Sequence, residues 1–331
     1  MSTYDAVSTY DVCAIGSALV DILAETADDL VGSLGLAKGS MQLVDLAASQ
    51  AIHSRLHGTT ERSGGSAANT VAGLASLGAT VGFIGRVASD RFGEVFAADL
   101  AELGVTFGGT ALDGATGRCL VLVTPDADRT MCTTLGAASL LDRDDLDLSL
   151  IEGATITYLE GYLWDEPVAI EALRTATDAA HRAGNRVALS LSDPFCVDRH
   201  RSEWVALIAA DIDLVFGNEA ELCSLFEVDD LGDACRRIAR PGLIVTVTRG
   251  AGGALAFDGL GEPIAVAAEP VPRVVDTTGA GDLYAAGFLY GLVRGATLGT
   301  CARYGAIAAA EVISHIGARP QQDLTTLLVG A

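Results

Sequence analysis

The residues best suited to chemistry lie in the segment Asp276-Thr277-Thr278-Gly279-Ala280-Gly281-Asp282. The two glycines, ahead of a helix predicted over 283–292, allow main-chain N–H groups to converge without an intervening Cβ. Together with the positive end of that helix, these groups predict a site for phosphate oxygens or a developing negative charge. Asp282 is expected beside this site, where its carboxylate can accept a hydroxyl proton during phosphoryl transfer. Taken alone, the segment is equally consistent with a tight turn before a helix.

A second glycine-rich segment, Gly64-Gly65-Ser66-Ala67-Ala68-Asn69, precedes a helix predicted over 67–77. Paired glycines allow close approach of a ligand, and the Asn69 amide can both donate to and accept from hydroxyl groups. Asp21, which follows a strand predicted over 11–16, is placed to chelate a sugar diol. Both features also fit plain structural roles, as a capped helix with a flexible start and as the first residue of a loop.

Two further features have a structural and a functional interpretation. The run Asn218-Glu219-Ala220-Glu221 matches a capping box, and it also places Asn218 and Glu221 near a hydrated Mg²⁺, which uses few protein ligands. Arg129, at the tip of a predicted hairpin, is either a solvated turn residue or a guanidinium that neutralises a transferred phosphate. Sequence alone leaves both pairs of alternatives open.

The elements that must position these residues alternate between strand and helix. Besides the elements already named, strands are predicted over 81–87, 156–159, 186–191, 213–216 and 243–248, and helices over 93–103 and 166–183. This rhythm predicts a parallel sheet covered on both faces. Two segments, about 21–45 and 113–137, interrupt it, and the second contains the predicted hairpin from Thr116 to Leu135. We expect one domain over 1–331, with these segments inserted as an edge decoration or a lid.

Composition excludes several classes of protein. The 331 residues carry 43 acidic and 21 basic side chains, and the net charge of −22 argues against coating nucleic acid or an anionic membrane. The apolar half of the chain excludes disorder, and no apolar run is long enough to span a membrane. Seven cysteines without a CxxC pair, and a start without a basic region, predict a cytoplasmic protein with reduced thiols and no signal peptide. Lys38, the single lysine, lies outside a P-loop frame.

The motifs, taken in order, resemble those of the ribokinase-like (PfkB) carbohydrate kinase family. They are GGSAAN, the run from Val81 to Gly93, NEAE, Thr248-Arg249-Gly250 and DTTGAGD, and the resemblance extends from about residue 11 to 320. It implies a three-layer α/β/α sandwich with a mainly parallel central sheet and a small β-sheet lid. It also implies ATP and Mg²⁺ as cofactors, and it leaves room for a monovalent cation such as K⁺.

The resemblance further implies a role for each matched residue. The catalytic set would be the base Asp282, the anion hole of Gly279, Ala280 and Gly281, and Arg129. The acceptor would be bound by Ser17, Leu19, Asp21, Gly64, Gly65, Asn69 and Tyr162. ATP would be bordered by Asn218, Thr248, Arg249, Gly250, Thr278, Gly279 and Gly281. Mg²⁺ would be organised by Asn218 and Glu221 through water.

Within the family the chain is most similar to adenosine kinases. The runs Gly16-Ser17-Ala18-Leu19-Val20-Asp21 and Leu189-Ser190-Leu191-Ser192-Asp193-Pro194-Phe195 resemble their substrate motifs, although Ser17 and Ser190 stand where asparagines are common. A second phosphate on the acceptor would need cationic side chains, which are few here, so a neutral acceptor is favoured. We therefore expect phosphorylation of adenosine to AMP by a monomer or homodimer. A kinase for a free sugar such as ribose or fructose, and a non-catalytic nucleoside-binding regulator, are the alternatives.

Overall fold

The computed structural model describes residues 9–126 and 128–330. Ala127 of the predicted turn, Ala331, and residues 1–8, on which the prediction about a signal peptide rests, lie outside the described residues. A nine-stranded sheet forms the centre of the molecule, in the order β16-β15-β14-β13-β12-β11-β1-β5-β7. Its strands are β1 (Tyr10–Ile15), β5 (Val81–Ile84), β7 (Thr106–Phe107), β11 (Ala154–Glu160), β12 (Arg186–Ser190), β13 (Leu214–Asn218), β14 (Ile244–Thr248), β15 (Ala254–Asp258) and β16 (Ile264–Val266). Neighbouring strands from β7 to β14 are parallel, whereas β15 and β16 are antiparallel.

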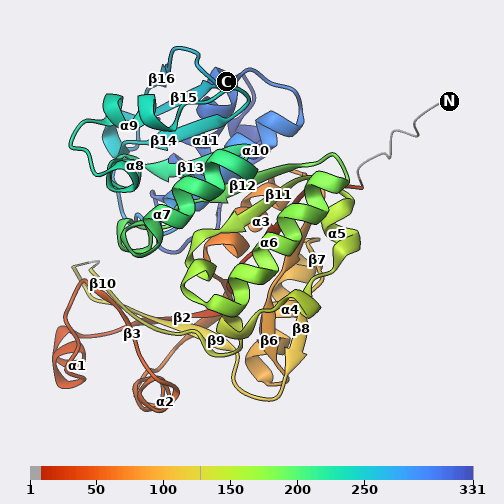
Figure 1. Cartoon of the computed structure of the whole chain (residues 1–331). Helices are drawn as coiled ribbons and strands as arrows, with labels where there is room; N and C mark the ends of the chain where they lie inside the picture. The colour runs from red at the N-terminus through yellow and green to blue at the C-terminus, as the bar shows by residue number, and fades with distance from the viewer. Residues whose placement is uncertain (1–8, 127, 331) are drawn as a thin grey trace.

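Helices cover both faces of this sheet, which gives the predicted three-layer sandwich (Figure 1). The helices are α1 (Asp28–Ser33), α2 (Leu46–His53), α3 (Ser66–Ser76), α4 (Arg91–Glu102), α5 (Leu148–Glu152), α6 (Pro167–Arg182), α7 (Pro194–Asp211), α8 (Glu219–Phe226), α9 (Leu231–Ile238), α10 (Ala280–Val293), α11 (Leu298–Val312) and α12 (Leu324–Leu327). Residues of β1 alternate between two cores, since Val12 and Ala14 pack with α3 and α10 while Cys13 and Ile15 pack with α6 and α7. A strand buried on both faces is typical of a parallel sheet between helical layers.

A second sheet of five strands projects from the central body, in the order β3-β10-β9-β2-β4. Its strands are β2 (Leu19–Glu25), β3 (Met41–Leu43), β4 (Thr60–Gly64), β9 (Gly117–Val123) and β10 (Arg129–Thr134). One face packs against α1 and α2, because Val20, Ile22 and Leu120 are buried with Val31 of α1. We call this sheet with α1 and α2 the arm. It contains the predicted hairpin, and also β4, which the expected segments 21–45 and 113–137 do not include.

One predicted element is wrong in its extent. The run 81–87 is not a single strand, because β5 ends at Ile84 and β6 (Arg86–Ala88) pairs instead with β8 (Thr110–Leu112). Gly85 lies at the break, and a Cβ there would lie 2.8 Å from the main-chain oxygen of Gly16. The chain therefore leaves the central sheet at Gly85, where glycine, which has no Cβ, avoids a clash with the Gly16 oxygen. The other predicted strands and helices are confirmed to within a few residues.

The described residues contain no helix that combines the length and the apolar character needed to span a membrane.

Candidate active site

A cavity of about 760 Å³ lies between the carboxyl ends of the parallel strands and the inner face of the arm. In a parallel α/β sheet this edge is where ligands bind. Fourteen of the predicted site residues line it, namely Ser17, Leu19, Asp21, Gly65, Asn69, Tyr162, Asn218, Glu221, Thr248, Thr278, Gly279, Ala280, Gly281 and Asp282. Four do not, namely Gly64, Arg129, Arg249 and Gly250. The structure thus brings together residues that are more than 250 positions apart in the chain.

The N-terminus of α10 forms a cradle of main-chain amides at one end of this cavity. Gly279 caps the helix with a φ of 77°, in the left-handed region that favours glycine. Among the described residues, the N–H groups of Gly279, Gly281 and Asp282 have no acceptor. A Cβ on Gly281 would meet only open space. The cradle is therefore accessible and suited to an anion.

Asp282 lies in the first turn of α10 and faces the start of α3. Its Oδ1 accepts a hydrogen bond from the Ser66 hydroxyl at 2.6 Å, and its Oδ2 accepts one from the Asn69 amide at 2.9 Å. A carboxylate has about four lone-pair sites, so these bonds orient it and still leave room for a further donor. Ser66 was not predicted as a site residue, although it lies inside the glycine-rich segment that was.

Burial raises the pKa of Asp282 to about 6, against the opposing effect of the Ser66 and Asn69 hydrogen bonds. Asp21, on β2, is raised to a pKa of about 6 as well, mainly by burial and also by the charge of Asp282. The positive charge of Arg319 lowers the pKa of both carboxyls. Two carboxylates with pKa values near 6 in one cavity are typical of proton-transfer and hydroxyl-binding sites.

Gly64 acts indirectly, because it makes room for Asp21. A Cβ on Gly64 would lie 2.3 Å from the Asp21 carboxyl carbon, on the neighbouring strand of the arm. In the strand pair β2–β4, the Asp21 carboxylate therefore packs directly on the main chain of Gly64. Any larger side chain at position 64 would displace it.

Glu160, at the end of β11, is a buried carboxyl that the sequence did not predict as a site residue. It accepts hydrogen bonds from the main-chain N–H groups of Ser17 at 3.2 Å and Ala67 at 2.9 Å. Burial raises its pKa to about 7 despite these bonds. Glu160 therefore joins the turn after β1 to the start of α3, on which Asn69 depends. The contacts span 143 and 93 positions, so no local pattern could reveal them.

Asn218 and Glu221 form the predicted capping box at the start of α8. The Asn218 Oδ1 accepts from the Glu221 N–H at 2.9 Å, and Glu221 Oε2 accepts from the Asn218 N–H at 2.9 Å. Glu221 Oε1 also accepts from the Asn218 side-chain amide at 2.5 Å. Burial raises the pKa of Glu221 to about 7. Both side chains are engaged with each other yet line the cavity, so their oxygens fit a hydrated Mg²⁺ through its waters rather than by direct coordination.

Arg129, from the arm, pairs with Asp276 of the central body. Asp276 is buried and also accepts from the main-chain N–H groups of Thr278 at 2.8 Å and Gly317 at 2.7 Å. The Nε and Nη2 atoms of Arg129 are buried and have no partner among the described residues. Arg129 therefore lies at Asp276, at the start of the loop that forms the cradle, and outside the lining of the cavity. Two of its guanidinium nitrogens remain available as hydrogen-bond donors.

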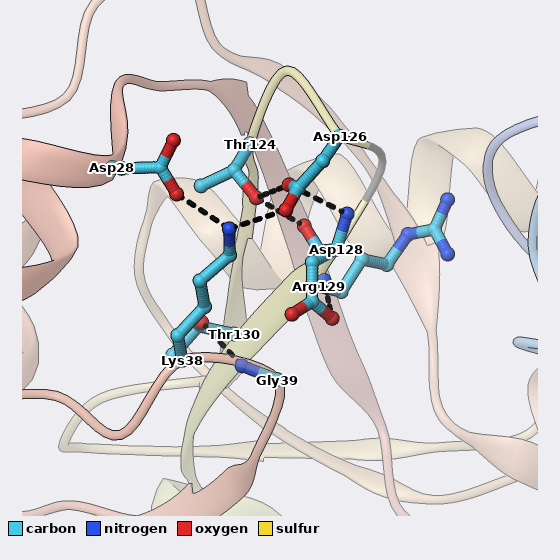
Figure 2. A network of polar contacts seen from close by, with 8 residues as sticks. All are labelled: Asp28, Lys38, Gly39, Thr124, Asp126, Asp128, Arg129 and Thr130. Carbon is cyan, nitrogen blue, oxygen red and sulfur yellow. Dashed lines mark hydrogen bonds and ion pairs between the residues drawn. The ribbon is translucent and has the colours of Figure 1, made fainter.

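The tip of the hairpin that carries Arg129 is held by the network in Figure 2. Lys38 binds Asp28 at 2.5 Å and Asp126 at 2.6 Å, which joins α1 to the turn after β9. The Thr124 hydroxyl donates to Asp126 at 2.6 Å, and the Gly39 N–H donates to the Thr130 hydroxyl at 3.1 Å. These contacts fix the turn from which the Arg129 side chain extends.

The run after β14 lies at the rim of the cavity. Thr248 lines it, whereas Arg249 turns its guanidinium toward the main-chain oxygen of Gly252 at 2.8 Å. Gly250 has a φ of 53° and starts a short 3₁₀ turn over Gly250–Gly252. Of the three residues Thr248, Arg249 and Gly250, Thr248 is therefore the one that reaches the cavity.

The arm contributes an apolar wall on the same sheet face that carries Asp21. Leu19, Cys119, Val121 and Met131 line the cavity from three neighbouring strands. Tyr162 and the 73% exposed Phe195 line it from the central body. The Tyr162 hydroxyl donates to the main-chain oxygen of Ser192 at 3.3 Å, so its polar end is directed to the main chain that follows β12 in the central body. This end of the cavity is therefore suited to a flat, largely apolar group.

Comparison with known proteins gives four matches, and all of them are kinases. A model of the pfkB family carbohydrate kinase matches residues 28–324. The adenosine kinase from Sinorhizobium meliloti is 42% identical with a TM-score of 0.88, over 96% of this chain and 98% of that chain. A probable sugar kinase protein from Rhizobium etli CFN 42 is 39% identical with a TM-score of 0.88, and the match covers 96% of this chain and 97% of that chain. A 5-dehydro-2-deoxygluconokinase from Geobacillus kaustophilus (strain HTA426) is 31% identical over 287 residues, which cover 82% of this chain and 85% of the relative.

Proposed function

The chain belongs to the pfkB family of carbohydrate kinases, and we propose that it transfers the γ-phosphoryl group of ATP to the 5′-hydroxyl of a nucleoside, adenosine in particular. The apolar wall of Leu19, Cys119, Val121 and Met131, next to Tyr162, carries the choice of acceptor. A purine base offers a flat apolar surface to such a wall, whereas a free sugar would place hydroxyls against it that the apolar side chains cannot pair.

Charge around the cavity supports a neutral acceptor. Asp21, Glu160, Asp165 and Asp193 line it, and Arg199 is the one cationic side chain in the lining that the structure describes. Its guanidinium is bound to Asp165 through two contacts of 2.8 and 2.5 Å. An acceptor with a carboxylate or phosphate would therefore meet repulsion that no free cation offsets.

In this proposal Asp282 receives the proton of the acceptor hydroxyl as that hydroxyl attacks the γ-phosphorus in line. Ser66 and Asn69 orient the carboxylate, and Asp21 with the Gly65 turn binds the ribose hydroxyls. The unpaired amides of Gly279, Gly281 and Asp282 stabilise charge on the transferred group. Because the acceptor and the amides meet at one helix terminus, most of the catalysis comes from positioning.

ATP would lie along the rim formed by Thr248, the main chain of Arg249 and Gly250, and Thr278. Mg²⁺, when bound, supplies charge neutralisation at the phosphates, and Asn218 and Glu221 would hold its waters. We treat the chain as one kinase domain in which the arm acts as a lid. In that role the two unpartnered nitrogens of Arg129 would turn toward the phosphates.

A sugar kinase is the second candidate, favoured by the similarity to the probable sugar kinase from Rhizobium etli and the 5-dehydro-2-deoxygluconokinase from Geobacillus kaustophilus. For such an acceptor, Asp21 and Asn69 would bind sugar hydroxyls in the same way. The apolar wall would then contact no base, which is the feature that makes this candidate weaker.

The decisive experiment is an ADP-release assay over a panel of acceptors. The panel contains adenosine, guanosine, cytidine, ribose, fructose and 5-dehydro-2-deoxygluconate, each with ATP and Mg²⁺, and each with and without K⁺. We expect the highest kcat/KM for adenosine and AMP as its product. Faster turnover of any sugar would overturn the nucleoside assignment, and tight adenosine binding without ADP release would indicate a regulator instead.

A further inference from the structure

The segment after α11 lies directly behind the amide cradle. The Gly317 N–H donates to Asp276, which also holds the Thr278 N–H. Ala318 packs so closely on Gly279 that a Cβ added to Gly279 would lie 2.6 Å from the Ala318 Cβ. The position of this segment is therefore fixed relative to the phosphate end of the cavity.

Arg319, the next residue, reaches in the opposite direction to the acceptor end. Its Nη1 donates to the main-chain oxygen of Ala68 at 2.7 Å. Its Nη2 donates to the main-chain oxygen and the hydroxyl of Ser63, both at 2.6 Å. Ser63 and Ala68 flank the turn that presents Ser66 and Asn69 to Asp282, so the guanidinium fork joins the two halves of the site.

The charge of Arg319 also acts on the site. Asp21, Asp99 and Asp282 face it, and Arg62 lies near it with the same sign. Asp99 is joined to it through Ser63, whose N–H and hydroxyl both donate to the Asp99 carboxylate. Besides Arg319, the titratable groups that interact with Asp282 are Asp21, Glu160, Tyr158 and Tyr162. Arg319 is thus the cation among a set of acidic and neutral groups around Asp282.

We propose that Arg319 is a positioning residue for phosphoryl transfer, which clamps the acceptor turn to the cradle and adds a positive charge to the acidic surroundings of Asp282. A planar fork suits this role, because two donors reach three acceptors with one geometry. The buried Nε atom has no hydrogen-bond partner among the residues that the structure describes, so the fork is held by its two Nη atoms. This inference rests on the proposed role of Asp282 as the base.

Two variants separate the fork from the charge. Arg319→Gln removes the charge, so we expect the acidic limb of the kcat/KM profile to move to higher pH by about one unit. Arg319→Lys keeps the charge but loses the fork, so we expect the limb to stay in place while kcat falls roughly tenfold or more. The matched control is Arg143→Gln, which removes one charge from a side chain that is 74% exposed.

For each variant, thermal unfolding and ATP affinity are measured together with the pH profile of kcat/KM, to show that the variant folds and binds nucleotide. If Arg319→Gln does not fold, Arg319→Lys alone decides, since unchanged kcat in that variant overturns the clamp. An unmoved acidic limb in folded Arg319→Gln overturns the electrostatic role. The variant Asp282→Asn separates a failure of this inference from a failure of the proposed function. If Asp282→Asn is inactive while Arg319→Gln is unaffected, only the inference about Arg319 is refuted.

Discussion

The central body and the arm hold their functional side chains in different ways. In the body, Asp282 is fixed by the first turn of α10 and by two hydrogen bonds from α3, all beside the buried core. In the arm, the hairpin tip is held by Lys38 with two carboxylates whose side chains are 57% and 59% exposed. Buried groups gain from low dielectric, whereas exposed ion pairs are screened by water and salt. The body therefore holds Asp282 through buried contacts, whereas the hairpin tip of the arm is held by exposed ion pairs that salt can weaken.

The largest effect should come from the body, in Asp282→Asn. The amide cannot accept the hydroxyl proton, so kcat should fall by about 10³- to 10⁴-fold. ATP affinity should change little, because the cradle is made of main-chain amides. Steady-state kinetics and a nucleotide titration test both statements. Normal phosphorylation by this variant would refute the assignment of the base.

A smaller loss is expected in the arm, from Arg129→Gln. Removing a charged donor from a partly buried site lowers kcat by roughly ten- to a hundredfold. The pair with Asp276 is lost as well, so we also expect weaker coupling between the arm and the body. Asp276→Asn removes the same ion pair from the other side and is the partner variant. If kcat of Arg129→Gln fell as far as that of Asp282→Asn, the contrast between the arm and the body would be refuted.

The pH profile is the third test, and its sign follows from the raised pKa values. Asp282 has a pKa of about 6 and must be ionised to act as the base. The value of kcat/KM should therefore be maximal above about pH 7 and fall about tenfold for each unit below the pKa. Asp21, also near 6, would make the fall steeper if its charge binds the acceptor. A rate that stays flat to about pH 5 would show that burial does not raise the pKa of Asp282.

The smallest effect is expected for Lys38→Gln. Its ion pairs are exposed, so kcat/KM should fall only about two- to fivefold. Salt should produce a similar fall in the unmodified protein and little further change in the variant, since screening acts on the same contacts. Kinetics at low and high NaCl test this. A loss as large as that of Arg129→Gln would indicate that the arm is held as rigidly as the body.

The sequence predicted what local pattern can encode. The cradle of Gly279 to Asp282, the capping box of Asn218 and Glu221, and the alternation of strands and helices all depend on residues within a few positions of one another. The same rules placed one strand too long at 81–87, because the need for glycine at position 85 depends on Gly16 across the sheet.

Long-range partners were out of reach of the sequence. Glu160 directly follows the strand predicted over 156–159, and Arg319 lies outside every predicted element. Their roles depend on Ser17, Ser63 and Ala68, which tertiary packing alone brings near. The pairing of Arg129 with Asp276 was likewise not predicted, because the two residues are 147 positions apart in the chain.

The wide sequence separation of these contacts has a consequence for synthesis of the protein. Asn69 and Asp282 are 213 positions apart, and Arg319 contacts Ser63 across 256. A nascent chain on the ribosome thus carries its acceptor turn long before the residues that complete the site have been translated. Folding of the first half can begin early, but the full set of contacts that joins the two halves of the site can form only after residue 319 has left the exit tunnel.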